Sequence, residues 1–310
     1  MDALQSLASP NSLRSRLAPP ATAVLLACGA LAAGAGPVCA WGPLGHRVAA
    51  LVAEARLAPE SRRALDELFG GSGALAQAAT CADDILRSTV PVLCAPGWLV
   101  EPDRTRESLD WHFINLPASA PADASSLDRY CPPRGCAPLA IRRQLAVLRE
   151  PRESAERRRL AVMYLTHLVA DLHQPLHCAD DGDLGGNRTR VKALGASKSL
   201  HELWDDLLLR ESKDVQRGMD PRPWVDWASP SRSRKALTRG DVIAAAALES
   251  HALARSLVYP AHRARGGEAV PEPHLRKARA VALGRLADAG IRLAFLLDGA
   301  LAQRRPASGP

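Results

Sequence analysis

The stretch that decides the fold is Tyr164-Leu-Thr-His-Leu-Val-Ala-Asp-Leu-His-Gln-Pro-Leu-His177. Within it, His167 and Asp171 stand four residues apart, and apolar spacing over 155–172 predicts a helix. Side chains at i and i+4 share one face of a helix, so this pair can hold one cation without bending the backbone. Pro175 should end the helix and let His177 return toward the same site. The stretch therefore predicts a helical frame with a metal site on it.

A second pair repeats this spacing, because His201 and Asp205 stand four apart in Leu200-His-Glu-Leu-Trp-Asp205. One such pair on a helix is usually an ordinary surface pair. Two pairs, together with His46 and His112, favour metal binding instead. Neutral imidazole and carboxylate are the usual ligands of catalytic zinc.

The three remaining histidines of the C-terminal half have no carboxylate at metal spacing and are expected to be ordinary surface or core residues: His251, His262 and His274. His173 is expected to support the site by holding a ligating carboxylate.

Helical patterns dominate the rest of the chain, and we find no convincing alternating strand or Asn-Gly hairpin. The chain is expected to form one all-α domain over 41–301, with long loops around a metal cleft and a tail at 302–310. Its helices are expected at 46–58, 59–69, 139–148, 155–172, 200–209, 241–257 and 275–301, and its long loops at 91–136 and 178–198.

The N-terminal segment has the pattern of a signal peptide over 1–40. Small apolar residues fill 20–36 after Arg14 and Arg16, and a small residue, Ala40, stands at the expected cut. We expect a secreted or periplasmic protein without stable membrane insertion, since the apolar run is short for a spanning helix. Cleavage after Ala40 would give Trp41 a free α-amino group that can chelate a metal, with His46 as a further ligand.

Charge and cysteines agree with this setting. The net charge is +7, and residues 1–40 carry two Arg and one Asp, which leaves +6 for the remainder. A basic chain favours an anionic partner such as nucleic acid, a nucleotide or an anionic lipid. In an oxidising compartment, Cys131 and Cys136 are a good disulfide candidate and Cys81 with Cys94 a second, which would leave Cys178 unpaired.

Several motifs, taken in order, carry a resemblance to a known family. They are Trp41-Gly-x-x-Gly-His46, Ala82-Asp-Asp-Ile85, Trp111-His-Phe-Ile-Asn115, the stretch His167–His177, Gly185-Gly-Asn187, Leu200–Asp205 and Arg285–Ala294. Over about 41–300 the chain resembles the exported, zinc-dependent, single-strand-specific nucleases and 3′-nucleotidases, which share a superfamily with bacterial zinc phospholipases C.

The resemblance implies three zinc ions per chain. The first would be held by Asp83, His112, His167 and Asp171. The second would be held by the amino and carbonyl groups of Trp41, by His46 and by Asp171, which is shared. The third would be held by His177, His201 and Asp205.

The resemblance also implies a reaction and substrates. A hydroxide bridging two cations would attack phosphorus, with Asp83 and Asp171 as the catalytic carboxylates. The enzyme would cut single-stranded DNA or RNA to 5′-phosphorylated products and remove phosphate from 3′-nucleotides, acting as a monomer. Substrate contacts would come from Phe113 and Leu184, which match base-clamping positions, and from Arg87, Asn115 and Asn187.

The chain departs from the family pattern at several positions. Cys81 replaces a Trp, and Asn115 replaces an Asp that can bond the base. A basic residue expected three positions after the first Asp ligand is Leu86, with Arg87 one later. Either Arg87 still reaches phosphate or Asp84 is the ligand, and Asp83 is favoured. Residues 87–110 are longer than usual and are expected to form a lip near the site.

Two alternative functions are also consistent with the sequence. A zinc phospholipase C would share the metal site and would need an apolar rim, for which residues 91–99 are candidates. A zinc-binding protein without catalysis would lack a ligand, yet every ligand position is filled. The basic charge and Phe113 favour the nuclease.

Overall fold

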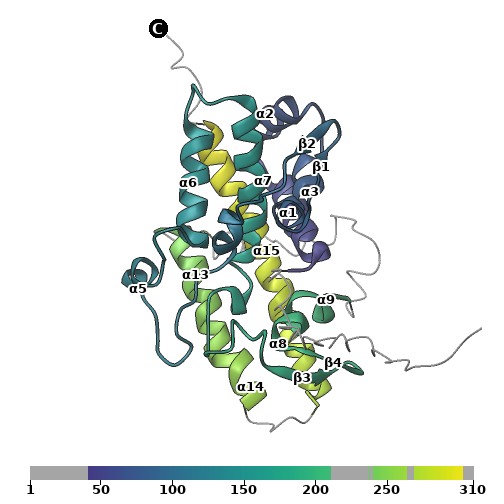
Figure 1. Ribbon diagram of the computed structural model, residues 1–310, viewed down its shortest axis with the longest axis vertical. Coiled ribbons are helices and arrows are strands. Elements are labelled where there is room, and N and C mark those ends of the chain that lie inside the picture. Colours follow the sequence, from purple (N-terminus) through teal and green to yellow (C-terminus); the bar gives the residue numbers. More distant parts are fainter. Residues whose placement is uncertain (1–40, 211–236, 238–239, 264–268, 303–310) are drawn as a thin grey trace, which may run out of the picture. The chain divides into compact units, whose positions relative to one another are not determined.

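The computed structural model describes residues 41–210, 237, 240–263 and 269–302. The predicted signal peptide and nearly all of the predicted tail lie outside the described residues. Within them, the fold is mostly helical, as predicted (Figure 1).

The longer helices lie close to the predicted ranges. They are α1 (Pro43–Arg56), α2 (Pro59–Phe69), α6 (Ala137–Arg149), α7 (Ala155–Asp171), α13 (Val242–Leu253) and α15 (Glu272–Ala302). The predicted helix at 200–209 is interrupted: α8 (Leu200–Glu202) and α9 (Leu208–Arg210) flank a π-helical turn, η3 (Leu203–Leu207). A second π-helical turn, η4 (Ala254–Val258), joins α13 to α14 (Tyr259–Arg263).

Local sequence signals set several of these helix ends. Pro59 opens α2, and Gly70 closes it in the left-handed conformation, with φ of 74°. The Ser154 side chain caps α7 by accepting a hydrogen bond from the Arg157 N–H, and Asp241 caps α13 in the same way.

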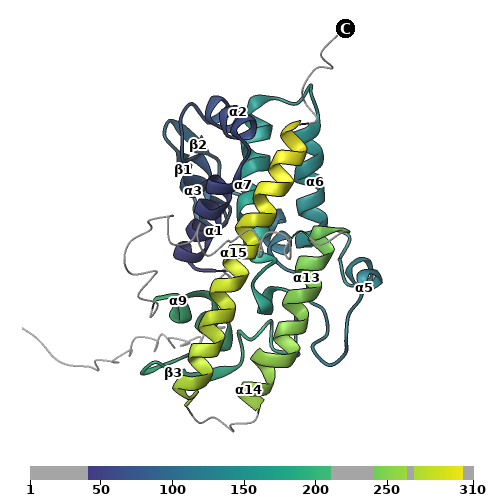
Figure 2. The same cartoon turned by 180° about the vertical axis from the view of Figure 1, so that it is seen from behind.

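The long helix α15 packs against both halves of the domain. Figures 1 and 2 show it in yellow, running beside α1, α7 and α13. Its closest approach to α1 is at Gly290, where a Cβ atom would lie 2.6 Å from the Ala49 carbonyl oxygen and 2.5 Å from the Val52 Cβ. Only glycine fits there, so the two helices pack backbone to backbone.

The hydrophobic core has two large parts. One is centred on α6, α7 and the end of α15 and includes Leu145, Leu165 and Leu297. The other surrounds Trp41 and Trp204 and joins α1 to η3 and the start of α15. The second half of α7, from Ala161 to Asp171, is buried except for the partly buried Tyr164, so His167 and Asp171 are enclosed by protein.

The two predicted long loops contain regular structure that the sequence analysis missed. Strands β1 (Val92–Ala95) and β2 (Trp98–Val100) form one antiparallel hairpin, and β3 (Arg190–Ala193) and β4 (Ala196–Ser199) form another. These strands have only three or four residues, too few for a clear alternation. The second turn contains Leu194 at φ 52° before Gly195, and Leu is not a residue that signals such a turn.

Further short helices also lie in segments without a helical prediction. They are α3 (Ala74–Ala78), α4 (Cys81–Arg87), α5 (Ala124–Arg129) and the 3₁₀ helices η1 (Glu107–His112) and η2 (Pro175–His177). Each spans one or two turns, too short for a hydrophobic period to emerge.

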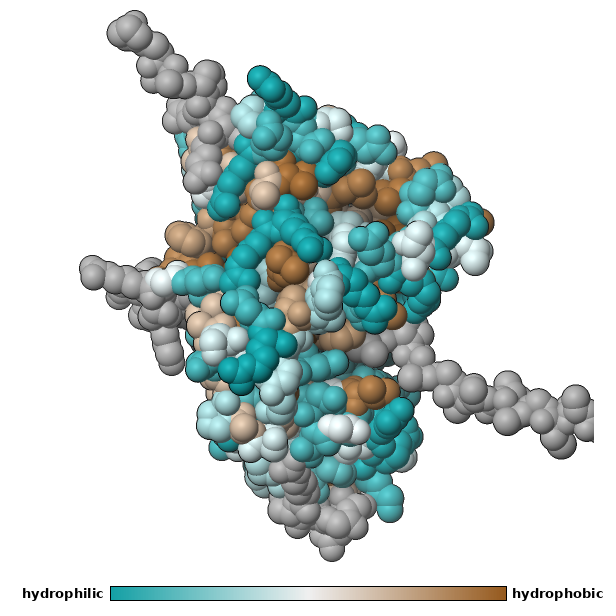
Figure 3. Space-filling model, turned by 60° about the vertical axis from the view of Figure 1, so that its left-hand side comes forward, coloured by the Kyte–Doolittle hydropathy of each residue, from teal (hydrophilic) through white to brown (hydrophobic). Residues whose placement is uncertain are grey.

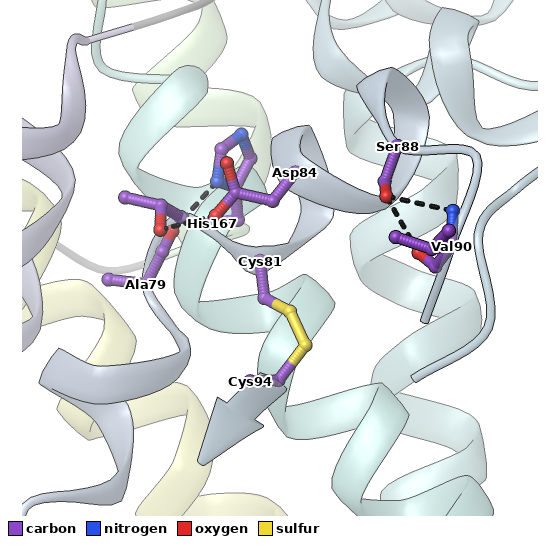
Figure 4. Close-up of a disulfide and its surroundings, with 8 residues drawn as sticks. Ala79, Cys81, Asp84, Ser88, Val90, Cys94 and His167 are labelled. Carbon is purple, nitrogen blue, oxygen red and sulfur yellow. Dashed lines mark hydrogen bonds between the residues drawn. A yellow bond between two sulfur atoms is a disulfide. The ribbon is translucent and has the colours of Figure 1, made fainter. Parts of the chain in front are cut away.

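Both disulfide candidates are formed, Cys81–Cys94 and Cys131–Cys136, and Cys178 is free and buried, as predicted. The first disulfide ties α4 to β1, as Figure 4 shows. Disulfides of this kind persist in oxidising compartments.

The described surface is mixed in polarity. Figure 3 shows one face, where hydrophobic residues in brown gather in the upper part among hydrophilic residues in teal. Three large apolar side chains are exposed at the β1–β2 hairpin and in the segment just before it: Val90, Leu93 and Leu99. Across the residues that the structure describes, no helix is both long enough and apolar enough to cross a membrane.

Candidate metal centre

Five predicted ligand residues from four elements meet around the end of α7. His46 comes from α1, Asp83 from α4, His112 from the end of η1, and His167 and Asp171 from α7. All five are buried. Their ligand atoms form two overlapping groups, His46–His167–Asp171 and Asp83–His112–His167, and within each group the atoms lie within 4.8 Å of one another.

The Asp171 carboxylate lies close to histidines of both groups. Its Oδ1 lies 3.4 Å from His46 Nε2, and its Oδ2 lies 2.9 Å from His112 Nδ1 and 3.4 Å from His167 Nε2. Asp83 Oδ1 closes the second group at 3.6 Å from His167 Nε2. One carboxylate thus faces both groups, which is the arrangement expected of a shared ligand.

Asp83 and its neighbour Asp84 differ in position relative to the two groups. Asp83 belongs to the group with His112 and His167, and its side chain is 8% exposed. The Asp84 side chain is 44% exposed and accepts a hydrogen bond from the Thr80 hydroxyl at 2.8 Å. Asp83 therefore faces the site, and Asp84 faces away from it.

The third group joins η2 to α8 and η3. His177 Nε2 lies 3.1 Å from His201 Nε2, which lies 3.3 Å from Asp205 Oδ2. As the sequence predicts, Pro175 follows the end of α7 and the chain returns so that His177 points inward. Asp205 sits in the π-helical turn, a local irregularity that often occurs at functional sites.

Backbone carbonyls orient three of the imidazole rings. The Nδ1 atoms of His167, His177 and His201 lie 2.6–2.8 Å from the carbonyl oxygens of Ala79, His112 and Gly185, respectively. Figure 4 shows the first of these contacts. A carbonyl oxygen can only accept, so each Nδ1 carries the proton and each Nε2 presents a lone pair. Ligating histidines are typically held in this way.

Two of these lone pairs face each other, at His177 Nε2 and His201 Nε2. At 3.1 Å two lone pairs repel unless a positive charge lies between or beside them. A cation shared with Asp205 removes this repulsion, so the donor set fits a metal ion.

Unpartnered buried atoms at the first two groups support the same conclusion. His46 Nδ1 and Nε2, His112 Nε2, His167 Nε2 and Asp171 Oδ1 are all buried without a hydrogen-bond partner. Buried polar atoms normally have partners, because leaving one unsatisfied costs about 1–3 kcal/mol. Several such atoms concentrated at one place indicate that a ligand completes the site.

Burial also works against charge on these side chains. Loss of solvation raises the pKa of Asp171 well above its usual value, although attraction to His167 opposes the rise. The pKa of Asp205 is likewise raised by burial, and the pKa of His46 is lowered by burial and then by His167. A bound cation stabilises the carboxylate form of both acids and requires neutral histidines.

The first described residues are anchored beside the centre. Trp41 is completely buried, and its Nε1 donates to the Ala170 carbonyl at 3.0 Å. The Gly42 N–H donates to the Asp205 carbonyl at 2.8 Å. These bonds hold Trp41 and Gly42 against α7 and η3.

The residues predicted to contact substrate differ in solvent exposure and in their partners. Arg87 pairs with Asp83 Oδ2 at 2.9 Å, and its side chain is 34% exposed. Phe113 is half-buried and Asn115 exposed. Leu184 is 41% exposed, and its carbonyl accepts a hydrogen bond from the half-buried Asn187 side chain at 2.8 Å.

The prediction for His173 is wrong. Its Nδ1 bonds to the Val169 carbonyl at 2.7 Å, and its Nε2 lies 2.9 Å from Arg292 Nη1, so it holds no carboxylate. Arg292 and Arg285 both reach Glu249, and Arg285 also donates to the His173 carbonyl. His173 therefore ties the end of α7 to α15. His251 is buried and bonded to the Pro117 carbonyl, an ordinary core role as predicted.

The residue that supports a ligating carboxylate is Gln174, which sequence reasoning missed. It is completely buried, and its Nε2 donates to Asp205 Oδ1 at 2.7 Å. The only signal in the sequence is its position, a polar residue just before Pro175 between two candidate ligands.

The fold and site define a class: a helical domain in which three buried His/Asp groups converge, each of a composition and geometry that could hold a metal ion. The family model described as S1/P1 Nuclease matches residues 41–302, and the chain belongs to that family.

Three relatives illustrate the similarity. Nuclease S1 of Aspergillus oryzae is 28% identical over 175 residues, which cover 56% of this chain and 55% of the relative. Endonuclease 3 of Arabidopsis thaliana is 29% identical over 187 residues, covering 58% of each. Nuclease P1 of Penicillium citrinum is 30% identical over 189 residues, covering 60% of this chain and 64% of the relative. The chain thus spans between half and two thirds of the length of these relatives.

Proposed function

We propose that the protein is a zinc-dependent endonuclease that hydrolyses single-stranded DNA and RNA to 5′-phosphorylated products and also acts as a 3′-nucleotidase. The observation that carries the proposal is the set of three buried His/Asp groups, two of them with unpartnered polar atoms, in a chain of the S1/P1 nuclease family. The names of the relatives, Nuclease S1 and Nuclease P1, support it.

The ligands proposed for three zinc ions follow the three groups. Asp83, His112, His167 and Asp171 would hold the first, and His177, His201 and Asp205 the third. The second would be held by His46, by Asp171 and by the main-chain amino and carbonyl groups of Trp41. When bound, zinc supplies Lewis acidity, which lowers the pKa of a water molecule and neutralises charge on a phosphate.

The protein's own residues would hold and orient the substrate. The Arg87 guanidinium lies beside Asp83 and is one-third exposed, so it can donate to a phosphate oxygen without leaving its partner. Phe113 and Leu184 would clamp an unpaired base, and Asn115 and Asn187 would contact it. A base in a duplex cannot enter such a clamp, which gives the preference for single strands.

A lipid-cleaving activity is the second candidate, and one observation favours it. Val90, Leu93 and Leu99 are each more than 60% exposed and form the apolar edge that such an enzyme would need. The family match and the net charge of +7 favour nucleic acid. The assay below separates the two.

We further propose that the chain is exported, as a secreted or periplasmic protein, after removal of residues 1–40, and acts as a monomer. The two disulfides support an oxidising compartment. Mass spectrometry of the exported protein tests the cut. A mass that begins at Trp41 agrees with the proposal, and a retained leader contradicts it.

Hydrolysis by the correctly processed protein tests the function. The substrates are single-stranded DNA, RNA, 3′-AMP and phosphatidylcholine, each with and without a chelator, and zinc is counted by emission spectroscopy. Close to three zinc ions per chain and chelator-sensitive release of 5′-nucleotides are expected. Cleavage of the lipid alone would assign the protein as a phospholipase C, and bound zinc without turnover would leave only a binding protein.

A further inference from the structure

A cavity of about 450 Å³ lies outside the metal centre, between β2, η1 and α7. Aromatic and apolar side chains line part of it, including Trp98, Trp111, Tyr164 and Leu160. Four carboxylates line the rest: Glu101, Asp103, Glu107 and Glu156. Of the described residues that line it, none is Lys, Arg or His. Cavities of this size commonly hold small molecules.

The aromatic rings of the lining are held by edge-to-face contacts. Trp111 and Tyr164 meet edge to face, with ring centroids 5.2 Å apart and an interplanar angle of 65°. Trp98 is held edge to face against Phe69, with centroids 5.6 Å apart. These contacts hold the Trp98, Trp111 and Tyr164 rings in place in the lining. The face of an aromatic ring attracts a cation.

Three of the four carboxylates have no side-chain partner within the part of the chain that the structure describes. Asp103 is occupied, because it accepts from the Ser108 N–H and hydroxyl at 2.9 and 2.7 Å. The Glu101, Glu107 and Glu156 side chains form no ion pair or side-chain hydrogen bond with another described residue. The cavity therefore keeps an uncompensated negative charge in a chain whose net charge is +7.

The nearest arginines in sequence do not neutralise this charge. Arg104 donates to the Thr89 carbonyl at 3.1 Å, and Arg106 donates to the Leu86 carbonyl at 3.4 Å. Both guanidinium groups thus donate to backbone carbonyls, in the last turn of α4 and just after it. The charged side chains that an anionic ligand such as a nucleotide would meet in this lining are all carboxylates, so the cavity disfavours the phosphate groups expected at the metal centre.

The same carboxylates do not form a metal site. Among the described residues, the groups whose ligand atoms lie within 4.8 Å of one another contain none of these four acids. These acids share the lining with aromatic and apolar side chains. This pattern suits a cation that carries its charge on an apolar body.

We propose that this cavity binds an organic cation, an ammonium compound with an aliphatic or aromatic body, whose charged group lies between the glutamates and the aromatic rings. The ligand class differs from the proposed substrates in sign of charge, and the site shares no residue with the metal groups. The protein would thus have a second small-molecule site beside its catalytic one.

Calorimetric titration of the full mature protein with benzyltrimethylammonium tests this proposal. We expect saturable binding of one cation per chain, at least about tenfold tighter than binding of neutral benzyl alcohol, because cation–π attraction and carboxylate charge act together. Equal affinity for the neutral compound would overturn the proposal, as would the absence of saturation. Displacement of the cation by AMP would also overturn it, since the cavity would then be a nucleotide site.

Two variants locate the binding. Glu107→Gln with Glu156→Gln removes two exposed charges and should weaken binding by about fivefold to tenfold. Glu67→Gln, an exposed glutamate on α2 outside the cavity, is the matched control and should change nothing. Leu160→Phe should fill the cavity and reduce binding while keeping the charges. If the control weakened binding as much as the double variant, or if Leu160→Phe left it unchanged, the cation would be bound elsewhere.

Discussion

Replacement of Gln174 by Glu isolates one contact that supports the third metal group. The Gln174 amide donates to Asp205 Oδ1 at 2.7 Å and accepts from the Leu176 N–H. It thereby fixes one oxygen of Asp205 and leaves the other, Oδ2, 3.3 Å from His201 Nε2. Gln174→Glu keeps the size of the side chain and the acceptor for Leu176. It replaces the donor with an oxygen that repels Asp205.

The size of the effect follows from the contact that is lost. A hydrogen bond to a charged acceptor contributes about 1.5–3 kcal/mol. Since every 1.4 kcal/mol is about a tenfold change in an equilibrium constant, zinc at the third group should bind about 10- to 100-fold more weakly. The same range is found when partners of metal ligands are changed in other proteins.

The assay is zinc retention under graded chelator, read by emission spectroscopy, with circular dichroism to check the fold. We expect Gln174→Glu to keep two zinc ions at a chelator concentration where the unchanged protein keeps three. Gln77→Glu, the same change at an exposed glutamine on α3, should behave like the unchanged protein. The reasoning is refuted if folded Gln174→Glu retains its third zinc as tightly as the unchanged protein does.

The remaining predictions concern activity and stability. Asp171→Asn removes the carboxylate that faces two of the groups. Nuclease activity should therefore fall about a thousandfold or more, and the zinc content should drop. The control Asp128→Asn, at an exposed site, should change neither activity nor zinc content. Arg87→Ala should lower kcat/KM on single-stranded DNA by about 10- to 100-fold through lost phosphate contact, and Arg87→Lys should recover part of it; an unchanged kcat/KM would remove Arg87 from the substrate site. Burial alone would raise the pKa of Glu249, but hydrogen bonds from Arg292 and attraction to Arg285 lower it on balance. Its contribution to stability is therefore present above its ordinary value of 4.5 and lost as the pH falls through the lowered value, so Glu249→Gln should flatten the acid limb of a plot of Tm against pH. Replacing Cys81 and Cys94 with Ser opens a link between positions 13 residues apart and should lower the free energy of unfolding by about 3 kcal/mol in urea titrations, and an unchanged midpoint would contradict this.

The parts of the fold that the sequence predicts are those with a repeating signal. The i, i+4 pairs and the apolar period locate α7 and the helix that begins at α8, and proline and glycine mark the ends of α2. The hairpins at 92–100 and 190–199 escape prediction because their strands are shorter than any detectable period.

The candidate site divides in the same way. His167 and Asp171 lie on one helix, so their proximity follows from helical geometry. Asp83 and His112 join them only because short helices bring distant segments together, and the resemblance to a known family, rather than spacing, identified them. His173 was misassigned because a buried histidine beside a ligand can equally bond to an arginine on a distant helix, and no local pattern reveals that.

The contact between α1 and α15 sets an order of events during synthesis. Helix α1 carries His46 and packs against Gly290 near the other end of the domain, so its partner surface does not exist until the last turns of α15 have left the ribosome. Local helices such as α7 can form early, but the centre cannot close around His46 before translation is nearly complete. A chain stopped short of Gly290 would hold all of the proposed metal ligands without the part of α15 that packs closely against α1. The domain is therefore expected to acquire its metal in one late step and not gradually along the growing chain.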